Sequence, residues 1–376
     1  MIPRLAHTRA CFAVAVLSVL LSGVGVQAQS VMQFDPSVIS AGMGGASGAV
    51  TWSAEPNYWA NPALLGYYDG LRWQSGRTKL IPNTDVYFIS KRFTLAAWGI
   101  GIESAGNPME GMGGLREEFG TGMYGDPSGS NHENIESLAL GISLASLTSS
   151  LLALRGAELP GIARHFDVAL GYARKETKLM AGTWVLLSGV AYDRGLLLRG
   201  GFSGPASPRG TRTRFDVSYG HSVLEYDEGL GEYGSTRDGA ALRLTIQQSA
   251  ASAPTGSWLH RSLIRAIQPP AALGYAFDQE HVDRGYTGYP RYTVKHHGVE
   301  LTMMNALSLR FGHVQNSLIN LNAETFGLGV SLPVGDFAGA RYDYARYARS
   351  SDRSQDLHEH SYSIFMNPLR MWREKQ

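Results

Sequence analysis

The sequence predicts an all-β protein, a transmembrane antiparallel β-barrel of about 14 strands, an even number within the usual range of such barrels. Three observations support this fold class. Apolar residues alternate with small or polar ones from about Leu71 almost to the C-terminus, the N-terminus has the layout of an export signal, and no linker or composition break divides the chain. We therefore assign residues 71–376 to one barrel.

The alternation gives each predicted strand one apolar face and one face of mostly Gly, Ala, Ser and Thr. A soluble β-sandwich shows the same alternation with its apolar face turned inward. The export signal and the continuation of the strands to the C-terminus favour the barrel, which also satisfies every backbone polar group within a bilayer. The clearest apolar series are Phe166-Val168-Leu170-Tyr172, Phe215-Val217-Tyr219, Leu242-Leu244-Ile246, Leu273-Tyr275-Phe277 and Phe326-Leu328-Val330-Leu332.

Residues 1–28 have the three parts of a cleavable signal peptide. Arg4 and Arg9 precede an apolar run at 11–21, and Val-Gln-Ala at 26–28 is a small-residue cleavage site. A retained membrane anchor fits less well, because the apolar run is shorter than the roughly 20 residues of a spanning helix.

The composition of the mature chain excludes several kinds of site. Cys11 is the only cysteine and lies within the signal peptide, so we expect no disulfide, thiolate metal site or cysteine nucleophile. Without Arg4 and Arg9, the 33 basic residues fall to 31 against 32 acidic ones, a formal charge of −1. This balance argues against nucleic acid as a partner.

Residues 29–70 form a separate segment before the strands. Glycines are frequent at 42–48, and Trp52, Tyr58 and Trp59 are too many aromatic residues for a simple linker. Asn61-Pro62 is a turn dipeptide. We expect a compact, irregular and partly buried segment.

This segment carries a family resemblance. Gly-Met-Gly-Gly-Ala at 42–46 and Tyr-Trp-Ala-Asn-Pro-Ala at 58–63 resemble the N-terminal pattern of FadL-type hydrophobic-compound transporters of bacterial outer membranes, and equally that of their PorV/PorQ-type relatives in type IX secretion. The usual pattern ends Asn-Pro-Ala-Gly, whereas Leu64 stands in the last place here. The resemblance continues near the C-terminus at 298–301, 307–312, 326–330 and 343–345. The middle of the chain resembles the family only in its general sequence character and not in specific motifs.

The resemblance implies that residues 29–70 fold inside the barrel as a hatch. The resemblance assigns this role to the motif residues Gly42, Met43, Gly44, Gly45, Ala46, Trp59, Asn61 and Pro62. It also implies passage of hydrophobic, fatty-acid-like small molecules across the outer membrane without covalent chemistry. The alternative is a PorV-type protein that binds exported protein cargo. A glycine-rich lead-in packed under the sheet, without gating, is a third interpretation of the segment.

The connections between strands differ in length. Short turns at 304–306 and 333–336 are typical of the periplasmic side of such barrels, and the longer polar stretches at 104–133, 224–236, 279–292 and 349–359 are predicted to be extracellular loops. The first loop is unusually apolar, which suggests either a capture surface for an apolar ligand or a loop folded on its own core. Its apolar residues are Met109, Met112, Leu115, Phe119, Met123 and Tyr124.

Two segments do not fit the strand pattern throughout. Residues 138–154 carry no charge, and we predict a strand to about Ala145 followed by a connection with helical character. Residues 257–268 place Leu259, Leu263 and Ile267 on one side of a short amphipathic helix.

No residues assemble into a recognisable catalytic or cofactor site. His358 and His360 share one face of a strand with Glu359 between them, but two evident ligands favour solvated histidines over a metal site. His296 and His297 point to opposite faces, and Ser203 lacks the Gly-x-Ser-x-Gly context of a nucleophile elbow. The charged residues expected to line and pair within the lumen are Arg243, Glu300, Arg341, Asp343 and Arg346.

The sequence therefore predicts a non-enzymatic protein with no cofactor and no metal. We expect it in the outer membrane of a Gram-negative-type bacterium, in contact with outer-membrane lipid. Its further partner is expected to be a hydrophobic small molecule or, in the alternative, exported protein cargo. An outer-membrane hydrolase is disfavoured, because no nucleophile and base stand together.

Overall fold

A computed structural model describes residues 35–79, 86–105, 117–121, 131–153, 165–181, 184–205, 211–227, 234–248, 270–283, 291–304, 306–318, 321–334, 338–347 and 356–367. Within these ranges one antiparallel sheet contains 15 strands. They are β1 (Gly70–Lys79), β2 (Val86–Ala97), β3 (Ile100–Ala105), β4 (Glu117–Thr121), β5 (Asn131–Ser143), β6 (Phe166–Ala181), β7 (Trp184–Ser203), β8 (Thr211–Asp227), β9 (Gly234–Gln248), β10 (Pro270–Asp283), β11 (Tyr292–Met303), β12 (Leu307–Asn316), β13 (Leu321–Val334), β14 (Ala338–Tyr347) and β15 (Leu357–Met366).

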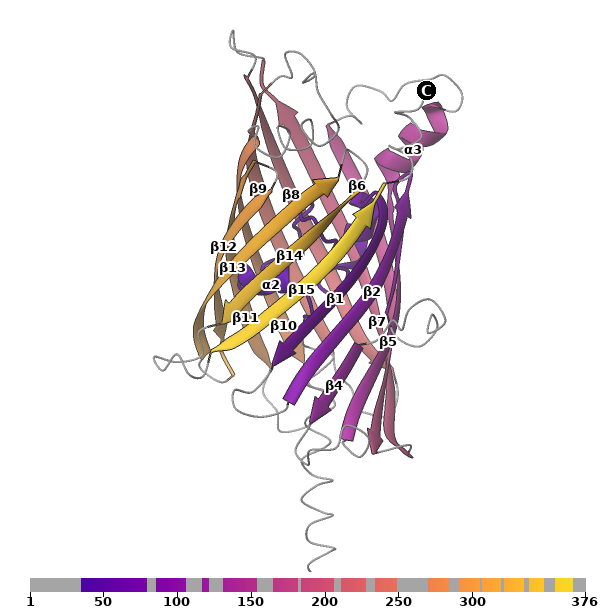
Figure 1. Cartoon of the computed structure of the whole chain (residues 1–376). Coiled ribbons are helices and arrows are strands. Elements are labelled where there is room, and N and C mark those ends of the chain that lie inside the picture. Colours follow the sequence, from indigo (N-terminus) through magenta and orange to yellow (C-terminus); the bar gives the residue numbers. More distant parts are fainter. Residues whose placement is uncertain are drawn as a thin grey trace, which may run out of the picture.

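The sheet closes on itself because β1 pairs with both β2 and β15, for example at Leu71 and Met366. Strands β3 and β4 share one place in the wall. On one side they pair with β2, Ala105 opposite Arg92 and Glu117 opposite Ser90, and on the other side both pair with β5. The barrel in Figure 1 therefore has 14 strand positions, which confirms the predicted fold class and strand number.

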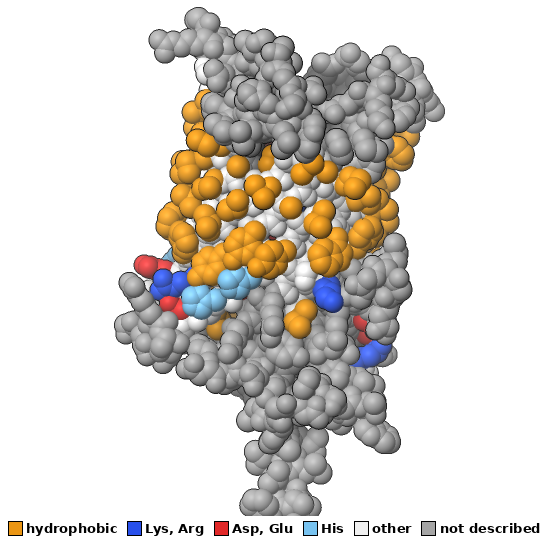
Figure 2. All heavy atoms as spheres, in the orientation of Figure 1, with side chains coloured by type: hydrophobic (Ala, Val, Ile, Leu, Met, Phe, Trp, Pro, Cys, Tyr) orange, Lys and Arg blue, Asp and Glu red, His pale blue; other side chains and the backbone are white. Residues whose placement is uncertain are grey.

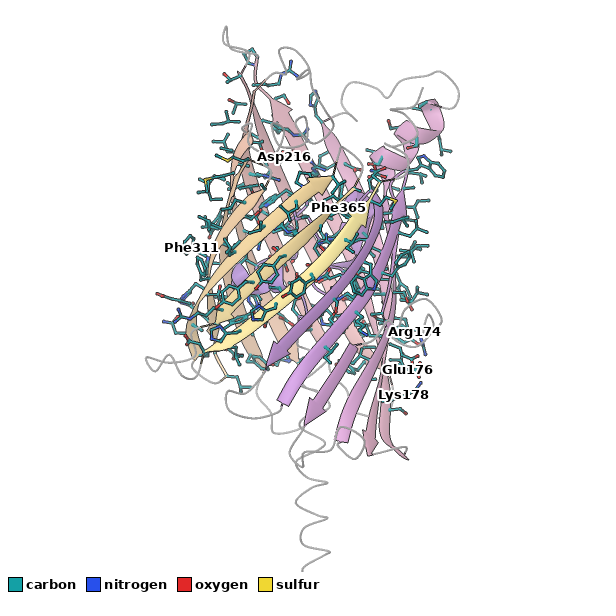
Figure 3. The ribbon with its side chains drawn as sticks, in the orientation of Figure 1. Arg174, Glu176, Lys178, Asp216, Phe311 and Phe365 are labelled. Atoms are coloured by element: carbon teal, nitrogen blue, oxygen red, sulfur yellow. The ribbon has the colours of Figure 1, made fainter. Side chains whose placement is uncertain are left out.

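The apolar faces of the strands point outward. Leu170 is 51% exposed, whereas the adjacent Ala169 on the inner face is fully buried. The same holds for Leu242 beside Ala241 and for Leu273 beside Ala272. Figure 2 shows the resulting band of hydrophobic side chains on the visible face of the barrel, and Figure 3 shows Phe311 pointing away from the wall. A sandwich would bury these side chains, so the band excludes that alternative and fits a wall that faces lipid.

Tyrosines and histidines hydrogen-bond on the outer surface of β14 and β15. The Tyr344 hydroxyl lies 2.8 Å from His358 Nδ1, and the Tyr342 hydroxyl lies 2.8 Å from His360 Nδ1. Histidines stand at one edge of the apolar band (Figure 2), where amphipathic rings match a membrane interface. The two histidines share a face as predicted, and the described residues contain no group of three metal-ligating side chains.

The two ends of the barrel carry different connections. Strands β11 and β12, and likewise β13 and β14, are connected at the end where β1 begins and β15 finishes, which we call the terminal end. Three of the longer polar connections join strands at the opposite end, and they are shorter than expected because the flanking strands extend into them: 228–233, 284–291 and 348–356.

The predicted loop at 104–133 is wrong as a single loop. Residues 104–105 belong to β3, 117–121 form β4, and 131–133 belong to β5. The turn signals around them are confined to the connections, and a five-residue strand is too short for its alternation to be evident. Of the predicted capture residues, Met109, Met112, Leu115, Met123 and Tyr124 lie outside the described residues; Phe119 lies in β4, and its side chain is not described.

The helix α3 (Leu144–Ala153) follows β5 directly, as predicted for the second half of 138–154. Asp167 of β6 accepts hydrogen bonds from Ala145 N at 2.8 Å and Ser143 Oγ at 2.5 Å, which fixes the start of the helix. None of the described helices is long and apolar enough to cross a membrane. The predicted helix at 257–268 lies outside the described residues.

We expect Leu242→Arg on the outer face of β9 to lower the free energy of unfolding by about 2–4 kcal/mol, because it places a charge in the middle of the lipid-facing band. Denaturant titration of the protein in lipid vesicles measures this change. The control is Gln279→Arg on the outer face of β10 near the opposite end, expected to cost about 0–1 kcal/mol. Equal costs for the two variants would contradict the assigned position of the band.

Candidate functional site

Residues 35–69, here called the luminal segment, lie inside the barrel. The segment contains α2 (Val38–Gly42) and a 3₁₀ helix (Pro62–Tyr67), joined by turns. Figure 1 shows α2 enclosed by the strands. Gly44 and Gly45 have φ of +67° and +86°, a conformation that favours glycine, and they reverse the chain after α2. Because most of the segment is irregular, its backbone polar groups need partners from the wall.

One wall carboxylate accepts two backbone hydrogen bonds from the luminal segment. Ser47 N and Gly48 N both donate to Oδ2 of Asp278 on β10, at 2.8 and 2.7 Å. Charge-assisted bonds of this kind are stronger than neutral ones. Asp278 therefore holds the centre of the segment against β10.

Wall side chains also donate to the carbonyl groups of the luminal segment. They come from inward-facing positions of β8, β11 and β13, so the segment is held from more than one part of the wall. The bonds are Ser218 Oγ to Ala49 O at 2.6 Å, Ser222 Oγ to Ala60 O at 2.8 Å, Thr325 Oγ1 to Gly42 O at 3.1 Å, and His296 Nδ1 to Gly44 O at 2.7 Å.

Asn61 and Pro62 start the 3₁₀ helix and connect it to the wall. Asn61 Oδ1 accepts from Ala63 N at 3.0 Å, while its Nδ2 donates to Gly48 O at 3.0 Å and to Leu196 O of β7 at 3.2 Å. Pro62 stands at a first-turn position that needs no N–H donor. The dipeptide thus joins two parts of the segment as well as segment and wall.

The aromatic residues of the motif pack against charged wall residues. Lys175 Nζ lies 4.1 Å from the ring centroid of Trp59 and 3.3 Å from Asp193 Oδ2. The Tyr58 hydroxyl lies 2.5 Å from Ser137 Oγ. All eight motif residues carried over from the family resemblance are buried in this segment, from Gly42–Ala46 to Trp59, Asn61 and Pro62.

Wall glycines form a groove that admits the luminal backbone. Gly101, Gly141, Gly171 and Gly195 stand directly opposite one another across β3, β5, β6 and β7. A Cβ atom at any of them would come within 3.0 Å of Leu65, Pro62, Ala63 or Asn61. The same close approach occurs at Gly220 on the adjacent strand β8, and at Gly298 on β11 and Gly312 on β12. Glycine at these positions therefore allows backbone to pack directly on backbone.

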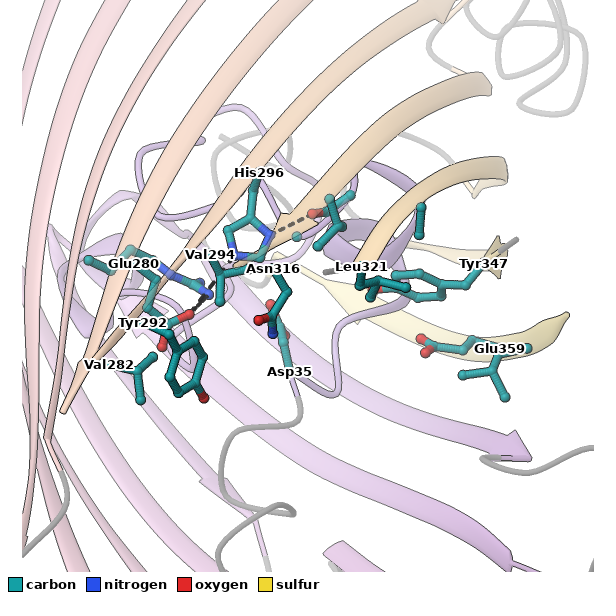
Figure 4. A pocket seen from close by; sticks show the side chains of 16 residues that line it. Asp35, Glu280, Val282, Tyr292, Val294, His296, Asn316, Leu321, Tyr347 and Glu359 are labelled. Atoms are coloured by element: carbon teal, nitrogen blue, oxygen red, sulfur yellow. Dashed lines mark hydrogen bonds and ion pairs between the residues drawn. The ribbon is translucent and has the colours of Figure 1, made fainter. Parts of the chain in front are cut away.

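A cavity of about 330 Å³ remains between the luminal segment and the wall (Figure 4). Gly44 and Gly45 contribute to it from the segment. Its wall residues stand at or next to strand ends on the side opposite the terminal end, and several are apolar. The lining comprises Asp35, Gly44, Gly45, Arg237, Glu280, Val282, Tyr292, Val294, His296, Val314, Asn316, Leu321, Ala323, Tyr347, Leu357 and Glu359.

The cations of this cavity are already engaged. Arg237 Nη2 lies 2.9 Å from Glu280 Oε2. His296 donates from Nδ1 to the luminal segment, and its Nε2 lies 3.9 Å from the same Glu280 oxygen. Glu359 has no such counter-ion among the described residues.

A second charged group fills the lumen between β11 and β14. Arg310 contacts Glu300 at 2.8 Å and Asp343 at 2.9 Å, and Arg341 contacts Asp343 at 2.7 Å. This confirms that Glu300, Arg341 and Asp343 pair in the lumen.

Arg243 and Arg346 were also predicted to face the lumen, and the prediction holds for Arg243 but not for Arg346. Arg243 faces the lumen, where its guanidinium carbon lies 5.8 Å from the ring centroid of Trp52. The predicted luminal position of Arg346 is wrong. It falls on the opposite face of β14 from Arg341 and Asp343, and it pairs with Asp356.

Several residues of the site escaped prediction. Asp278, Glu280 and Arg237 lie in strands whose alternation is visible, but alternation does not tell how deep a residue lies or what it meets across the lumen. His296 was considered only with its neighbour His297, and the two do point to opposite faces: His296 to Gly44, His297 to the Tyr275 hydroxyl at 3.0 Å. The wall glycines carried a usable signal, namely glycine at inward positions of successive strands.

Comparison with solved structures returns hydrophobic-compound transporters. The chain is similar to the toluene transporter TodX of Pseudomonas putida (12% identity, TM-score 0.42, 88% of this chain and 98% of that one). It is similar to the toluene transporter TbuX of Ralstonia pickettii (13%, 0.33, 88% and 97%) and to a FadL homologue of Pseudomonas aeruginosa (9%, 0.39, 88% and 98%). No protein-family model and no curated protein sequence matches the chain. Because these sequence identities and TM-scores are low, the fold assignment rests on the strand pairing described above.

We expect Gly171→Ala to destabilise the protein by about 1–3 kcal/mol, because the new methyl group overlaps Ala63 of the luminal segment. Thermal unfolding of the purified protein, followed on gels by the mobility of the folded barrel, measures the loss. Gly200→Ala on β7 is the control, since the nearest atoms lie 3.8 Å from its added Cβ. If both variants unfold at the wild-type temperature, the luminal segment does not pack in the groove.

Proposed function

We propose that this protein is an outer-membrane channel for hydrophobic small molecules and that the luminal segment is its hatch. The observation that carries the proposal is the cavity bounded by Gly44 and Gly45 of the segment and by the strand ends opposite the terminal end. Its volume of about 330 Å³ lies within the range typical of small-molecule sites, and much of its wall is aliphatic. An apolar molecule that enters the barrel from this end meets the cavity before it meets the hatch.

The proposal places the end opposite the terminal end at the cell exterior, as expected for the polar connections at 228–233, 284–291 and 348–356. Two longer connections, 144–165 and 249–269, join strands at the terminal end. Export through the signal peptide at 1–28 brings the chain to the outer membrane of a Gram-negative-type bacterium, where lipid contacts the apolar band. Passage then requires binding and movement only, so no catalytic residue or cofactor is assigned.

Opening the route requires part of residues 42–61 to move. The hydrogen bonds of Ser47 and Gly48 to Asp278 lie at the middle of this stretch and act as a latch between hatch and wall. Sideways exit through the wall is a second route. The candidate position is the change from Ala105 of β3 to Glu117 of β4, where one residue of β2, Lys91, lies between the two paired residues Arg92 and Ser90.

The PorV-type alternative assigns the loops at the exterior end to the binding of exported protein cargo. A sealed lumen would favour it, whereas the cavity favours the channel. The longer exterior connections lie largely outside the described residues, so the alternative stays a prediction from the sequence.

Uptake into vesicles with an outer leaflet of lipopolysaccharide tests the channel, because this leaflet slows apolar solutes. We expect the reconstituted protein to accelerate entry of radiolabelled toluene several-fold over empty vesicles and to leave entry of radiolabelled sucrose unchanged. Toluene entry at the rate of empty vesicles would overturn the proposed function.

We expect Asp278→Asn to loosen the hatch, because the variant loses charge-assisted bonds that contribute about 1.5–3 kcal/mol each to holding it. Ion conductance across planar bilayers measures this, and we predict more frequent or longer open events than in the wild type. The matched control is Asp238→Asn, whose carboxylate lies on the outer face and accepts from Tyr219 and His221. A conductance equal to wild type in both variants would contradict the role of Asp278 as a latch.

A further inference from the structure

Glu359 is a buried carboxyl group without a hydrogen-bond partner among the residues that the structure describes. It lies on the inner face of β15, is 1% exposed, and lines the cavity. Neither carboxyl oxygen accepts a hydrogen bond from any described residue. Figure 4 shows the carboxyl group of Glu359 directed into the space enclosed by the labelled residues. An isolated buried carboxyl group is costly to a protein unless something else donates to it.

His296 contributes a second polar atom to the same cavity. Its Nδ1 donates to Gly44 O, whereas its Nε2 is buried without a hydrogen-bond partner among the described residues and lies 3.9 Å from Glu280 Oε2. Among the described lining residues, the unfilled acceptor positions are therefore the two carboxyl oxygens of Glu359.

The cavity offers no uncommitted positive charge among its described lining. Arg237 pairs with Glu280 at 2.9 Å, and His296 faces the same carboxylate. Asp35 adds a third carboxyl group, which accepts from Ser37 N at 3.0 Å and Asn57 Nδ2 at 2.7 Å. A ligand carboxylate would meet three carboxyl groups, beside the neutral Asn316 and Tyr347 that can donate or accept, whereas a donor or a cation would meet complementary groups.

The apolar part of the cavity lining determines the kind of ligand body that fits. Val282, Val294, Val314, Leu321 and Leu357 provide aliphatic surface around these acceptors. A bound molecule consequently needs an apolar body as well as a donor head group.

We infer that this cavity selects hydrophobic molecules with a hydrogen-bond-donating or cationic head group, such as amines and alcohols, and discriminates against carboxylates, with Glu359 as the recognition residue. This inference rests on the proposed function, because it names the ligand class of the same channel. It departs from the fatty-acid-like ligand expected from the sequence.

Equilibrium dialysis of the full protein in lipid nanodiscs tests the inference, with empty nanodiscs as the blank. Radiolabelled benzylamine, benzoate and toluene share one ring, and at pH 7 the amine is cationic and the acid anionic. We expect benzylamine to bind about tenfold more tightly than benzoate, and Glu359→Gln to bring the ratio close to one. Glu324→Gln, on the exposed outer face of β13, is expected to keep the wild-type ratio.

The ratio of benzylamine to benzoate affinity decides the inference, and toluene reports separately on the channel. Equal affinities of the wild-type protein for benzoate and benzylamine would overturn the inference. This measurement does not depend on the folding of any variant. A ratio unchanged by Glu359→Gln would overturn the role of Glu359. Toluene binding together with either outcome leaves the proposed function standing, whereas loss of toluene binding and of toluene entry into vesicles removes the function itself.

Discussion

The arrangement of the lumen depends on direct contact between the backbone of residues 35–69 and the backbone of the wall. Such contact is sterically open only to glycine, and Gly101, Gly141, Gly171 and Gly195 supply it in four strand positions that are neighbours in the wall. Polar groups of an irregular segment need partners wherever water is excluded. The groove brings the segment near enough for Asp278 and Ser218 to provide them.

This constraint explains why the lumen is divided into regions of different character. Where the segment lies in the groove, the bore is filled by backbone and small side chains. Between β11 and β14, the lumen is filled by two arginines and two carboxylates whose charges balance: Arg310, Arg341, Glu300 and Asp343. Beside Gly44 and Gly45, where φ is positive and the chain turns away, open volume remains. The position of the cavity thus follows from the path of the luminal segment.

The architecture of the wall was predictable from the sequence, because the alternation of apolar and polar residues depends only on which face of a strand meets lipid. Leu170 and Ala169 illustrate this, since a one-residue step decides exposure. The pairing of β3 and β4 in one strand position was not predictable in the same way. It depends on which residues of β2 and β5 they meet, and five residues at 117–121 show too little alternation to reveal a strand.

The candidate site was predictable only in part. The motif at 42–46 and 58–63 identified the segment, because glycines and aromatic residues in that pattern are unusual for a linker. Glu359 and His296 come from strands β15 and β11, which are not neighbours in the sheet, and nothing in local periodicity indicates that they share a cavity. Their sequence neighbours His297, His358 and His360 lie on the outer face, where they contact tyrosine hydroxyl groups.

Amide hydrogen exchange of the folded protein in nanodiscs tests the central claim most directly, namely that the luminal segment is held against the wall by its backbone. The account predicts that the amides of Ser47, Gly48 and Ala63 exchange as slowly as those of the barrel strands, because each donates to a buried acceptor. Exchange of these amides at the rate of an unstructured peptide, with the strand amides still protected, would contradict it.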